Sequence, residues 1–244
     1  MIDPEFVHPD WPAPVNVRAL TTTRVGGLSR GPYESFNLGD HVGDAPDDVR
    51  RNRALLREVL TLPAEPVWLK QVHGVNVVDA ASVNVGATAD GAWTGRPGVV
   101  CAVLTADCLP VFLCNRQGTK VALLHAGWRG LTAGVIEAGL RALATPGAEL
   151  LAWFGPAIGP DSYEVGDDVR NVFLAQDAGA AVCFHEHGAG RWLANLYALA
   201  RRRLQVKGVN AIYGGNFCTL RERERFFSFR RAGMRQCRER HDSR

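Results

Sequence analysis

The 244-residue sequence lacks any run of about 18 consecutive apolar residues, so it predicts no membrane-spanning helix and no membrane partner. Its N-terminus, MIDPEFVHPDWPAP, has no basic segment followed by an apolar one, and we therefore expect no secretory signal peptide. The six cysteines show neither a CxxC spacing nor the pattern of a small disulfide-linked domain. Free thiols and a cytoplasmic location are expected, because disulfides are rare in that compartment.

Signatures of nucleotide and nucleic-acid binding are also missing. The sequence contains no GxGxxG and no GxxxxGK[ST] motif, so dinucleotide-binding and P-loop proteins have no support. The formal net charge is only +3, and residues 217–244 hold nine arginines against four acidic residues. Because the positive charge is concentrated near the C-terminus and forms no broad basic surface, we expect no nucleic-acid substrate or partner.

Strand-like and helix-like segments alternate along the chain without a linker or an internal repeat. Helices are predicted where apolar residues recur at helical spacing, and strands where short apolar runs end at turns. The predicted helices are 47–60, 131–144 and 191–204, and the predicted strands are 15–23, 66–73, 75–80, 98–106, 111–114, 120–125 and 150–154, with AIYGG and FFSFR closing the sheet. This mixed order predicts one α/β or α+β catalytic domain, residues 1–244, around a mixed sheet.

Three of the apolar runs end at side chains that can bind a metal ion. His73 ends one predicted strand, Cys108 closely follows another, and His125 ends a third. Polar residues at strand ends are held on a rigid scaffold, and they converge if their strands share one region of a sheet. One thiolate and two imidazoles form the protein ligand set of a catalytic zinc site that keeps a fourth position open. The pattern therefore makes these residues candidate zinc ligands.

Two other interpretations of these residues stay open at this point. A buried cysteine is often only a small hydrophobic residue, and a histidine at a strand end is often a hydrogen-bonded structural group. Alternatively, Cys108 acts as a nucleophile with His125 as its base and Asp107 or another acid orienting the imidazole. A further run of possible ligands, His185-Glu186-His187, lies in a glycine-rich loop and is expected to face solvent.

Candidate substrate-binding residues lie in turns and loops. Arg129 and a glycine directly precede the helix predicted over 131–144, where free N–H groups and the helix dipole favour an anion. Arg24 occupies a second Arg-plus-glycine turn, RVGG, and a following loop supplies Asn37 and His41. A thiol–imidazole centre beside an anion site indicates a small substrate that carries or consumes phosphate.

The motifs TTRVGG, SFNLGDHVGD, WLKQVHG, TADCLPV, HAGWRG, GPAIGPDSYEVG and FFSFRR occur in the order found in the YfiH-like laccase-domain family. This resemblance covers about residues 11–231. It implies a single domain with α/β/β/α layers and mixed sheets. Carried over residue by residue, the family's metal site falls on His73 in QVHG, Cys108 in ADCLP and His125 in HAGWRG, the same three residues that the strand ends indicate.

The resemblance implies more than one activity. The family is described as purine nucleoside phosphorylase, acting on adenosine, inosine and methylthioadenosine with phosphate, with adenosine deaminase as a further activity. It is also described as copper-dependent polyphenol oxidase and as peptidoglycan editing factor, and the last implies a cysteine-type hydrolase. A multicopper oxidase needs several copper ions and many histidines, whereas this chain has seven histidines in total. A single site with one thiolate favours zinc, with copper as a possible occupant.

Deamination and phosphorolysis place different demands on such a site. Zinc activates water for attack on C6 of adenine in a deaminase. Phosphorolysis instead requires phosphate held near C1′ of the ribose, so the anion site matters more. Purine nucleoside and phosphate are the expected substrates, and nothing in the sequence indicates an oligomeric state.

The chain departs from the family after FFSFRR. Relatives continue into a hydrophobic strand, whereas residues 232–244 are polar and basic and have no strand pattern. We therefore expect 232–244 to be a divergent basic tail. The residues of the candidate metal site lie upstream of it.

Overall fold

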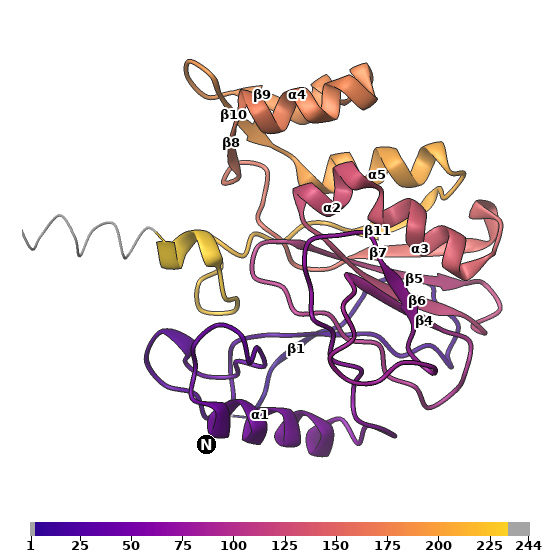
Figure 1. Ribbon diagram of the computed structural model, residues 1–244, viewed down its shortest axis with the longest axis vertical. Coiled ribbons are helices and arrows are strands. Elements are labelled where there is room, and N and C mark those ends of the chain that lie inside the picture. The colour runs from indigo at the N-terminus through magenta and orange to yellow at the C-terminus, as the bar shows by residue number, and fades with distance from the viewer. Residues whose placement is uncertain (1–2, 234–244) are drawn as a thin grey trace, which may run out of the picture.

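The computed structural model describes residues 3–233, which are built around a mixed six-stranded sheet (Figure 1). Its strand order is β11-β7-β5-β6-β4-β3. The two outermost pairs, β11–β7 and β3–β4, are parallel and the central pairs are antiparallel, so the predicted mixed sheet is confirmed. The strands are β3 (Val77–Asp79), β4 (Gly91–Thr94), β5 (Leu109–Asn115), β6 (Val121–Ala126), β7 (Leu150–Phe154) and β11 (Ala211–Gly214).

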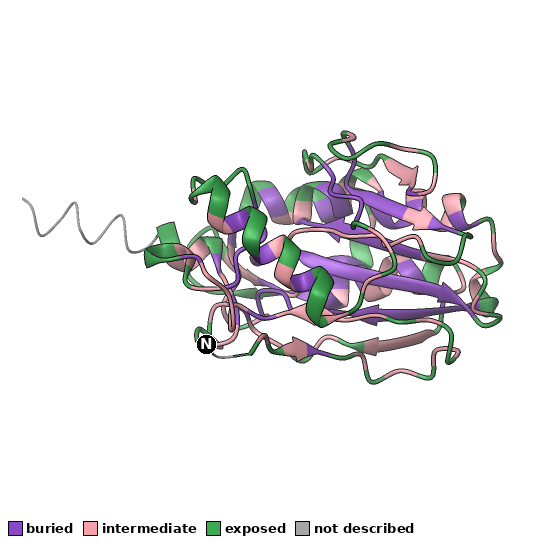
Figure 2. Cartoon of the chain, turned by 90° about the horizontal axis from the view of Figure 1, so that it is seen from below, coloured by how far each residue is buried: buried purple, intermediate pink, exposed green. Residues whose placement is uncertain are grey.

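Both faces of this sheet are covered, which is why its central strands read as continuous apolar runs. In β5, Leu109 and Val111 pack into the largest core cluster, whereas Phe112 points to the other face and meets Trp153. Buried residues accordingly fill the strands of the sheet in Figure 2. The first face lies under α2 (Trp128–Ala133), α3 (Val135–Leu143) and α5 (Leu196–Val206) (Figure 1).

The opposite face is covered by a largely irregular layer, with α1 (Pro46–Val59) beyond it (Figure 1). This layer contains the two-residue strands β1 (Phe6–Val7) and β2 (Thr21–Thr22) and isolated bridges such as Val67–Cys101. Leu56 of α1 and Trp68 belong to its own apolar cluster. The order helix, sheet, extended layer, helix agrees with the layers that the resemblance implies.

A small antiparallel sheet, order β8-β10-β9, stands apart from the main one and carries α4 (Asp167–Gln176) (Figure 1). Its strands are β8 (Glu164–Gly166), β9 (Phe184–Glu186) and β10 (Arg191–Ala194). Three short 3-10 helices complete the described elements: Gly31–Tyr33, Gly147–Glu149 and Ala178–Cys183. Within residues 3–233, no helix combines the length and the apolar character needed to cross a bilayer.

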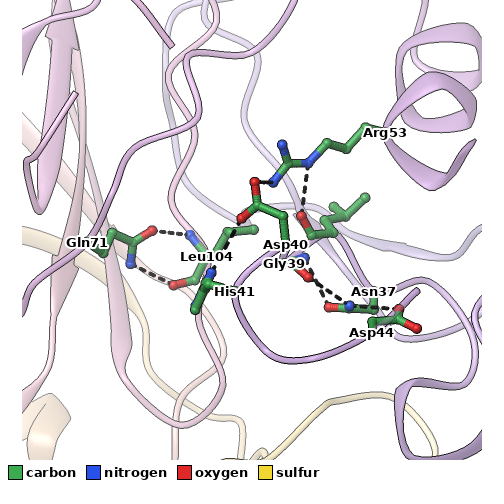
Figure 3. A network of polar contacts seen from close by, with 9 residues as sticks. Asn37, Gly39, Asp40, His41, Asp44, Arg53, Gln71 and Leu104 are labelled. Atoms are coloured by element: carbon green, nitrogen blue, oxygen red, sulfur yellow. Dashed lines mark hydrogen bonds and ion pairs between the residues drawn. The ribbon is translucent and has the colours of Figure 1, made fainter. Parts of the chain in front are cut away.

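Several predicted strands are wrong in extent. The strand predicted over 15–23 is reduced to β2, and 66–73 and 98–106 form only isolated bridges. Between these last two segments a side chain replaces the backbone ladder: Gln71 donates to the carbonyl of Leu104 at 2.8 Å and accepts from its N–H at 2.7 Å (Figure 3). FFSFR is not a strand either, because its backbone and side chains bind a buried aspartate described below.

Two predicted helices are also corrected. The helix predicted over 131–144 begins three residues earlier and is interrupted at Gly134, whose φ of 99° separates α2 from α3. The helix predicted over 191–204 is a strand, β10, followed by α5. Asn195 ends the strand and starts the helix, since its side chain accepts a hydrogen bond from the N–H of Ala198. Of the predicted tail 232–244, residues 234–244 lie outside the described residues.

Candidate metal centre

The structure brings the side chains of His73, Cys108 and His125 together. Their ligating atoms all lie within 4.8 Å of one another, and we call this group the ligand cluster. The placement differs in detail from the prediction, because only His125 lies in a strand, β6. Cys108 directly precedes β5, and His73 occupies a turn with a φ of 59°. The three residues therefore meet at one edge of the sheet without each ending a strand.

The cluster is buried on one side and open on the other. Sγ of Cys108 lies 3.8 Å from Nε2 of His73, and the two imidazole rings meet edge to face with centroids 4.7 Å apart. His125 is buried, Cys108 is half-buried and His73 is exposed. An ion held here would have protein on one side and free access from the other, as a catalytic site requires.

Asp90 holds two of the three candidate ligands in place. Its Oδ1 lies 2.8 Å from Nδ1 of His125 and accepts the N–H of His73, also at 2.8 Å. Its Oδ2 accepts the N–H groups of Gly74 at 2.6 Å and Val72 at 3.2 Å. One carboxylate thus orients the His125 ring and fixes the strained turn that carries His73. Nδ1 of His125 is engaged by Asp90, which leaves Nε2 for a metal ion.

Asp107, which the nucleophile interpretation placed beside His125, has a different role. It adopts a φ of 86°, and its buried carboxylate accepts the hydroxyls of Thr219 at 2.7 Å and Ser228 at 3.0 Å. It also accepts the N–H of Arg230 at 2.8 Å. Asp107 therefore ties residues 219–230 to the backbone next to Cys108, and Asp90 is the acid that orients His125.

Gly127 lies against the cluster because no larger residue fits there. A Cβ atom at this position would come within 2.8 Å of Sγ of Cys108 and 3.1 Å of Cδ2 of His73. Its own backbone is extended, with a φ of −69°, so the requirement is for space and not for an unusual conformation. The glycine of the HAGWRG motif thus allows the chain to pass from β6 into α2 beside the ligands.

The electrostatics of the cluster favour a thiolate. Burial raises the pKa of Cys108, but hydrogen bonds and charge from His125 and His73 outweigh it and lower the pKa to about 7. Burial lowers the pKa of His125, yet its hydrogen bonds to Asp90 and Cys108 raise it to about 9. Elsewhere burial raises the pKa of Cys101 to about 12. Burial also raises the pKa of Cys218 while hydrogen bonds to Ser162 and to backbone groups lower it overall, but only Cys108 combines a lowered pKa with two imidazoles in the described part of the chain.

The donor set fits a single zinc ion. One thiolate and two imidazoles match the ligands that zinc prefers, and the accepted Nδ1–H of His125 is the usual support for a zinc-bound histidine. Within the described part of the chain, the ligand cluster is the one group of three or more His, Cys, Asp or Glu side chains with this proximity. His185 and His187 are exposed, and Nε2 of His187 lies 3.7 Å from Oε2 of Glu164.

The two candidate arginines differ in how they are engaged. The guanidinium of Arg24 donates to the carbonyls of Glu34 and Arg223, so it braces two loops. Arg129 is not ahead of a helix, as predicted, but inside α2, where it is exposed and lies 4.4 Å above the ring of Trp128. No ion pair engages Arg129 within residues 3–233.

Asn37 and His41 belong to a network that stabilises their own loop (Figure 3). The Asn37 side chain accepts the N–H of Gly39 at 3.0 Å and donates to Asp44 at 2.9 Å. His41 is exposed and lies 3.6 Å from Asp40, which Arg53 also contacts. These contacts give Asn37 a structural role and place His41 at the surface of the loop.

Comparisons with known proteins match most of the chain to one family. Residues 18–239 match the family model described as multi-copper polyphenol oxidoreductase laccase. The chain is 52% identical over 228 residues to a purine nucleoside phosphorylase of Pseudomonas aeruginosa and 50% identical to purine nucleoside phosphorylase YfiH of Escherichia coli K12, with 93% of each chain covered. Among solved structures it resembles a Neisseria meningitidis protein, with a TM-score of 0.90, 49% identity and 93% coverage of both chains. YlmD of Geobacillus stearothermophilus follows with a TM-score of 0.83, 32% identity and coverage of 89% and 87%.

Proposed function

Because this chain belongs to the multi-copper polyphenol oxidoreductase laccase family, and close relatives in it are named purine nucleoside phosphorylases, we propose that it is a metal-dependent purine nucleoside phosphorylase. The observation that carries the proposal is the convergence of one thiol and two imidazoles beside an open face, in a chain half identical to those relatives. The substrates we propose are adenosine, inosine and methylthioadenosine together with phosphate.

The reaction is a balanced group transfer. An oxygen of hydrogen phosphate forms a bond to C1′ of the ribose, and the bond from C1′ to the purine nitrogen breaks. The bonding electrons pass to the purine, which takes the proton that the phosphate brought. The products are the free base and ribose 1-phosphate, or methylthioribose 1-phosphate from methylthioadenosine.

The residues of the centre have distinct roles in this proposal. His73, Cys108 and His125 would hold a zinc ion, with copper as the alternative occupant, and the ion would supply polarisation and anchoring of the nucleoside. Asp90 positions His125 and His73. Arg129, exposed in α2, attracts the phosphate. Arg24, Asn37 and His41 act through the loops they stabilise, and we assign them no direct contact with substrate.

Two of the alternative functions are weighed by the same geometry. Four-electron reduction of oxygen needs several copper ions, and one ligand cluster in the described part of the chain gives this little support. A cysteine-type hydrolase, such as one that edits a peptidoglycan precursor, has a specific observation in its favour. The pKa of Cys108 is lowered to about 7 by His125, which Asp90 orients, and this is also the arrangement of a catalytic cysteine.

Product analysis separates these functions. Zinc-loaded protein is incubated with adenosine in the presence and absence of phosphate, and the products are resolved by chromatography. We expect adenine and ribose 1-phosphate only when phosphate is present, and inosine if the same centre also deaminates adenosine. Inosine alone would make the protein a deaminase. If neither adenine nor inosine forms, the result would favour the hydrolase. The free thiols of the five described cysteines agree with the cytoplasmic location proposed for the enzyme.

A further inference from the structure

A cavity of about 470 Å³ opens where α2, the small sheet β8-β10 and the segment after FFSF come together. Its lining combines aromatic rings, charges of both signs and bare backbone. The lining residues that matter here are Trp128, Tyr163, Glu164, Asp168, Arg191 and Arg230. None of the candidate site residues predicted from the sequence lines this cavity, so the sequence alone does not predict it.

Tyr163 presents a hydroxyl that has no partner within residues 3–233. The residue is only 7% exposed, and no hydrogen bond to its hydroxyl is formed inside the described part of the chain. The ring is buried, but the hydroxyl oxygen is not sealed off from solvent, so water or a ligand can reach it. Since Tyr163 lines the cavity, its hydroxyl is available to a ligand there.

Two guanidinium groups lie near this hydroxyl. Arg230 lines the cavity, whereas Arg129 does not, but the Arg129 guanidinium lies 4.4 Å above the ring of Trp128, which does. The guanidinium of Arg230 lies 5.2 Å from the centre of the Tyr163 ring. Burial raises the pKa of Tyr163, and the positive charges of Arg230 and Arg129 oppose that rise. Neither arginine forms an ion pair in the part of the chain that the structure describes. Arg191, by contrast, lies 3.3 Å from Glu164 and is neutralised by it.

The cavity adjoins the ligand cluster. Trp128 directly follows Gly127, where a Cβ atom would lie 2.8 Å from Sγ of Cys108 and 3.1 Å from Cδ2 of His73. The backbone N–H of Arg230 binds Asp107, the residue before Cys108. The charge of Cys108 also acts on the Tyr163 phenol. The Gly127–Trp128 step and the Asp107–Arg230 hydrogen bond therefore link the cavity wall to the surroundings of the ligand cluster.

The charges indicate the chemical class of the ligand. Two guanidinium groups that form no ion pair within residues 3–233, together with a hydroxyl donor, suit a phosphoryl group, whose oxygens accept charge-assisted hydrogen bonds. Asp168 at the cavity wall is an acceptor and repels a simple anion, but it suits the hydroxyl groups of a sugar. A ligand that joins a phosphoryl group to a polyol satisfies both sides.

We propose that this cavity is the subsite for phosphate and for the sugar phosphate product, with Tyr163, Arg230 and Arg129 on the phosphoryl group and Asp168 on the ribose hydroxyls. This inference deepens the proposed phosphorolysis and rests on it for the identity of the sugar. It adds three binding residues, Tyr163, Arg230 and Asp168, to Arg129.

Equilibrium binding of inorganic phosphate and of ribose 1-phosphate, measured by calorimetry without turnover, tests the subsite. Arg230→Gln keeps the backbone N–H that binds Asp107, and Tyr163→Phe removes only the hydroxyl. We expect about 10- to 100-fold weaker binding in Arg230→Gln and about 3- to 10-fold weaker binding in Tyr163→Phe. Arg191→Gln is the matched control: it removes the same charge from the same cavity, but that charge is already paired, and we expect less than about 3-fold change.

The outcomes distinguish this subsite from the proposed function. Unchanged phosphate affinity in both Tyr163→Phe and Arg230→Gln, with unchanged melting temperature, overturns the subsite even if wild-type protein performs phosphorolysis. Weaker affinity in both variants supports the subsite even if no phosphorolysis is found, in which case the proposed function alone fails. Cys108→Ser should still bind phosphate, since the subsite does not need the metal; loss of binding there would place the phosphate on the metal and overturn the proposal.

Discussion

Nδ1 of His125 lies 2.8 Å from Oδ1 of Asp90, and both side chains are almost completely buried. Burial raises the pKa of Asp90, but hydrogen bonds to His125 and to the backbone of Gly74 and Val72 outweigh burial. The net pKa therefore lies below its ordinary value, and the carboxylate stays ionised. This one group fixes the ring of one candidate ligand and the backbone turn of another. The metal centre therefore depends on a residue that does not itself belong to the ligand cluster.

Replacing Asp90 with asparagine should weaken zinc binding by about 10- to 100-fold, as is usual when the partner of a metal-binding histidine is changed. The amide keeps the size of the side chain but loses the charge that holds His125 and the turn. Zinc affinity is measured by competition with a chromophoric chelator. Asp79→Asn is the control, since Asp79 serves only the local turn to Ala81 and Ser82. Equal zinc affinities in the two variants would show that Asp90 does not position the ligands.

Gly127→Ala should destabilise the centre by crowding it. The new methyl group would lie 2.8 Å from Sγ of Cys108, so the sulfur must move. Overpacking of this kind costs about 1–3 kcal/mol in the free energy of unfolding, and zinc affinity should fall with it. Urea denaturation and zinc competition measure the two effects. Gly95→Ala is the control because its nearest neighbour would be 3.6 Å away. A Gly127→Ala protein with wild-type stability and zinc affinity would contradict the close packing described above.

Alkylation of Cys108 distinguishes a metal ligand from a free nucleophile. After chelation, the rate with iodoacetamide should rise with pH through a midpoint of about 7, because the lowered pKa gives a thiolate above that pH. Burial raises the pKa of Cys101 to about 12 and of Cys114 to about 11, so both should remain unreactive. With zinc bound, Cys108 should be protected. Mass spectrometry of the modified peptides follows each site.

Rapid stoichiometric alkylation of Cys108 in the zinc-loaded protein, with loss of activity, would instead support the cysteine-type hydrolase. A midpoint near 9, the ordinary value for a thiol, would mean that His125 and His73 do not act on the sulfur in solution. The first result would contradict the role of Cys108 as a metal ligand, and the second would remove the electrostatic basis for a thiolate in the metal centre.

The sequence predicts the central strands well and their surroundings poorly. The runs that become β5, β6 and β7 are apolar throughout because both faces of the sheet are covered, so they are visible from composition alone. The sequence predicts one helix over 191–204 because its apolar residues continue across Asn195 at helical spacing. Only pairing with β8 and β9 shows that its first four residues form a strand.

The same contrast holds for the site. Cys108 and the two histidines could be identified from their chemistry and from the motifs around them. Asp90 could not, because a single acidic residue before β4 carries no pattern, and its role depends on N–H groups of residues 72–74 that only the fold brings to it. The role of Tyr163 cannot be predicted from the sequence for a similar reason, since only the folded chain forms the cavity that its hydroxyl faces.

The most direct test of the account is phosphorolysis of inosine by metal-free protein titrated with zinc, comparing the wild type with His73→Ala. His73 is the exposed candidate ligand, so its loss should leave the fold intact, and His185→Ala, which removes an exposed histidine outside the ligand cluster, is the control. We expect ribose 1-phosphate formation in the wild type and in His185→Ala to rise with zinc and saturate at about one ion per chain, and His73→Ala to stay at least about 100-fold less active. Full activity in metal-free protein, or wild-type activity in His73→Ala, would contradict the assignment of this centre to the reaction.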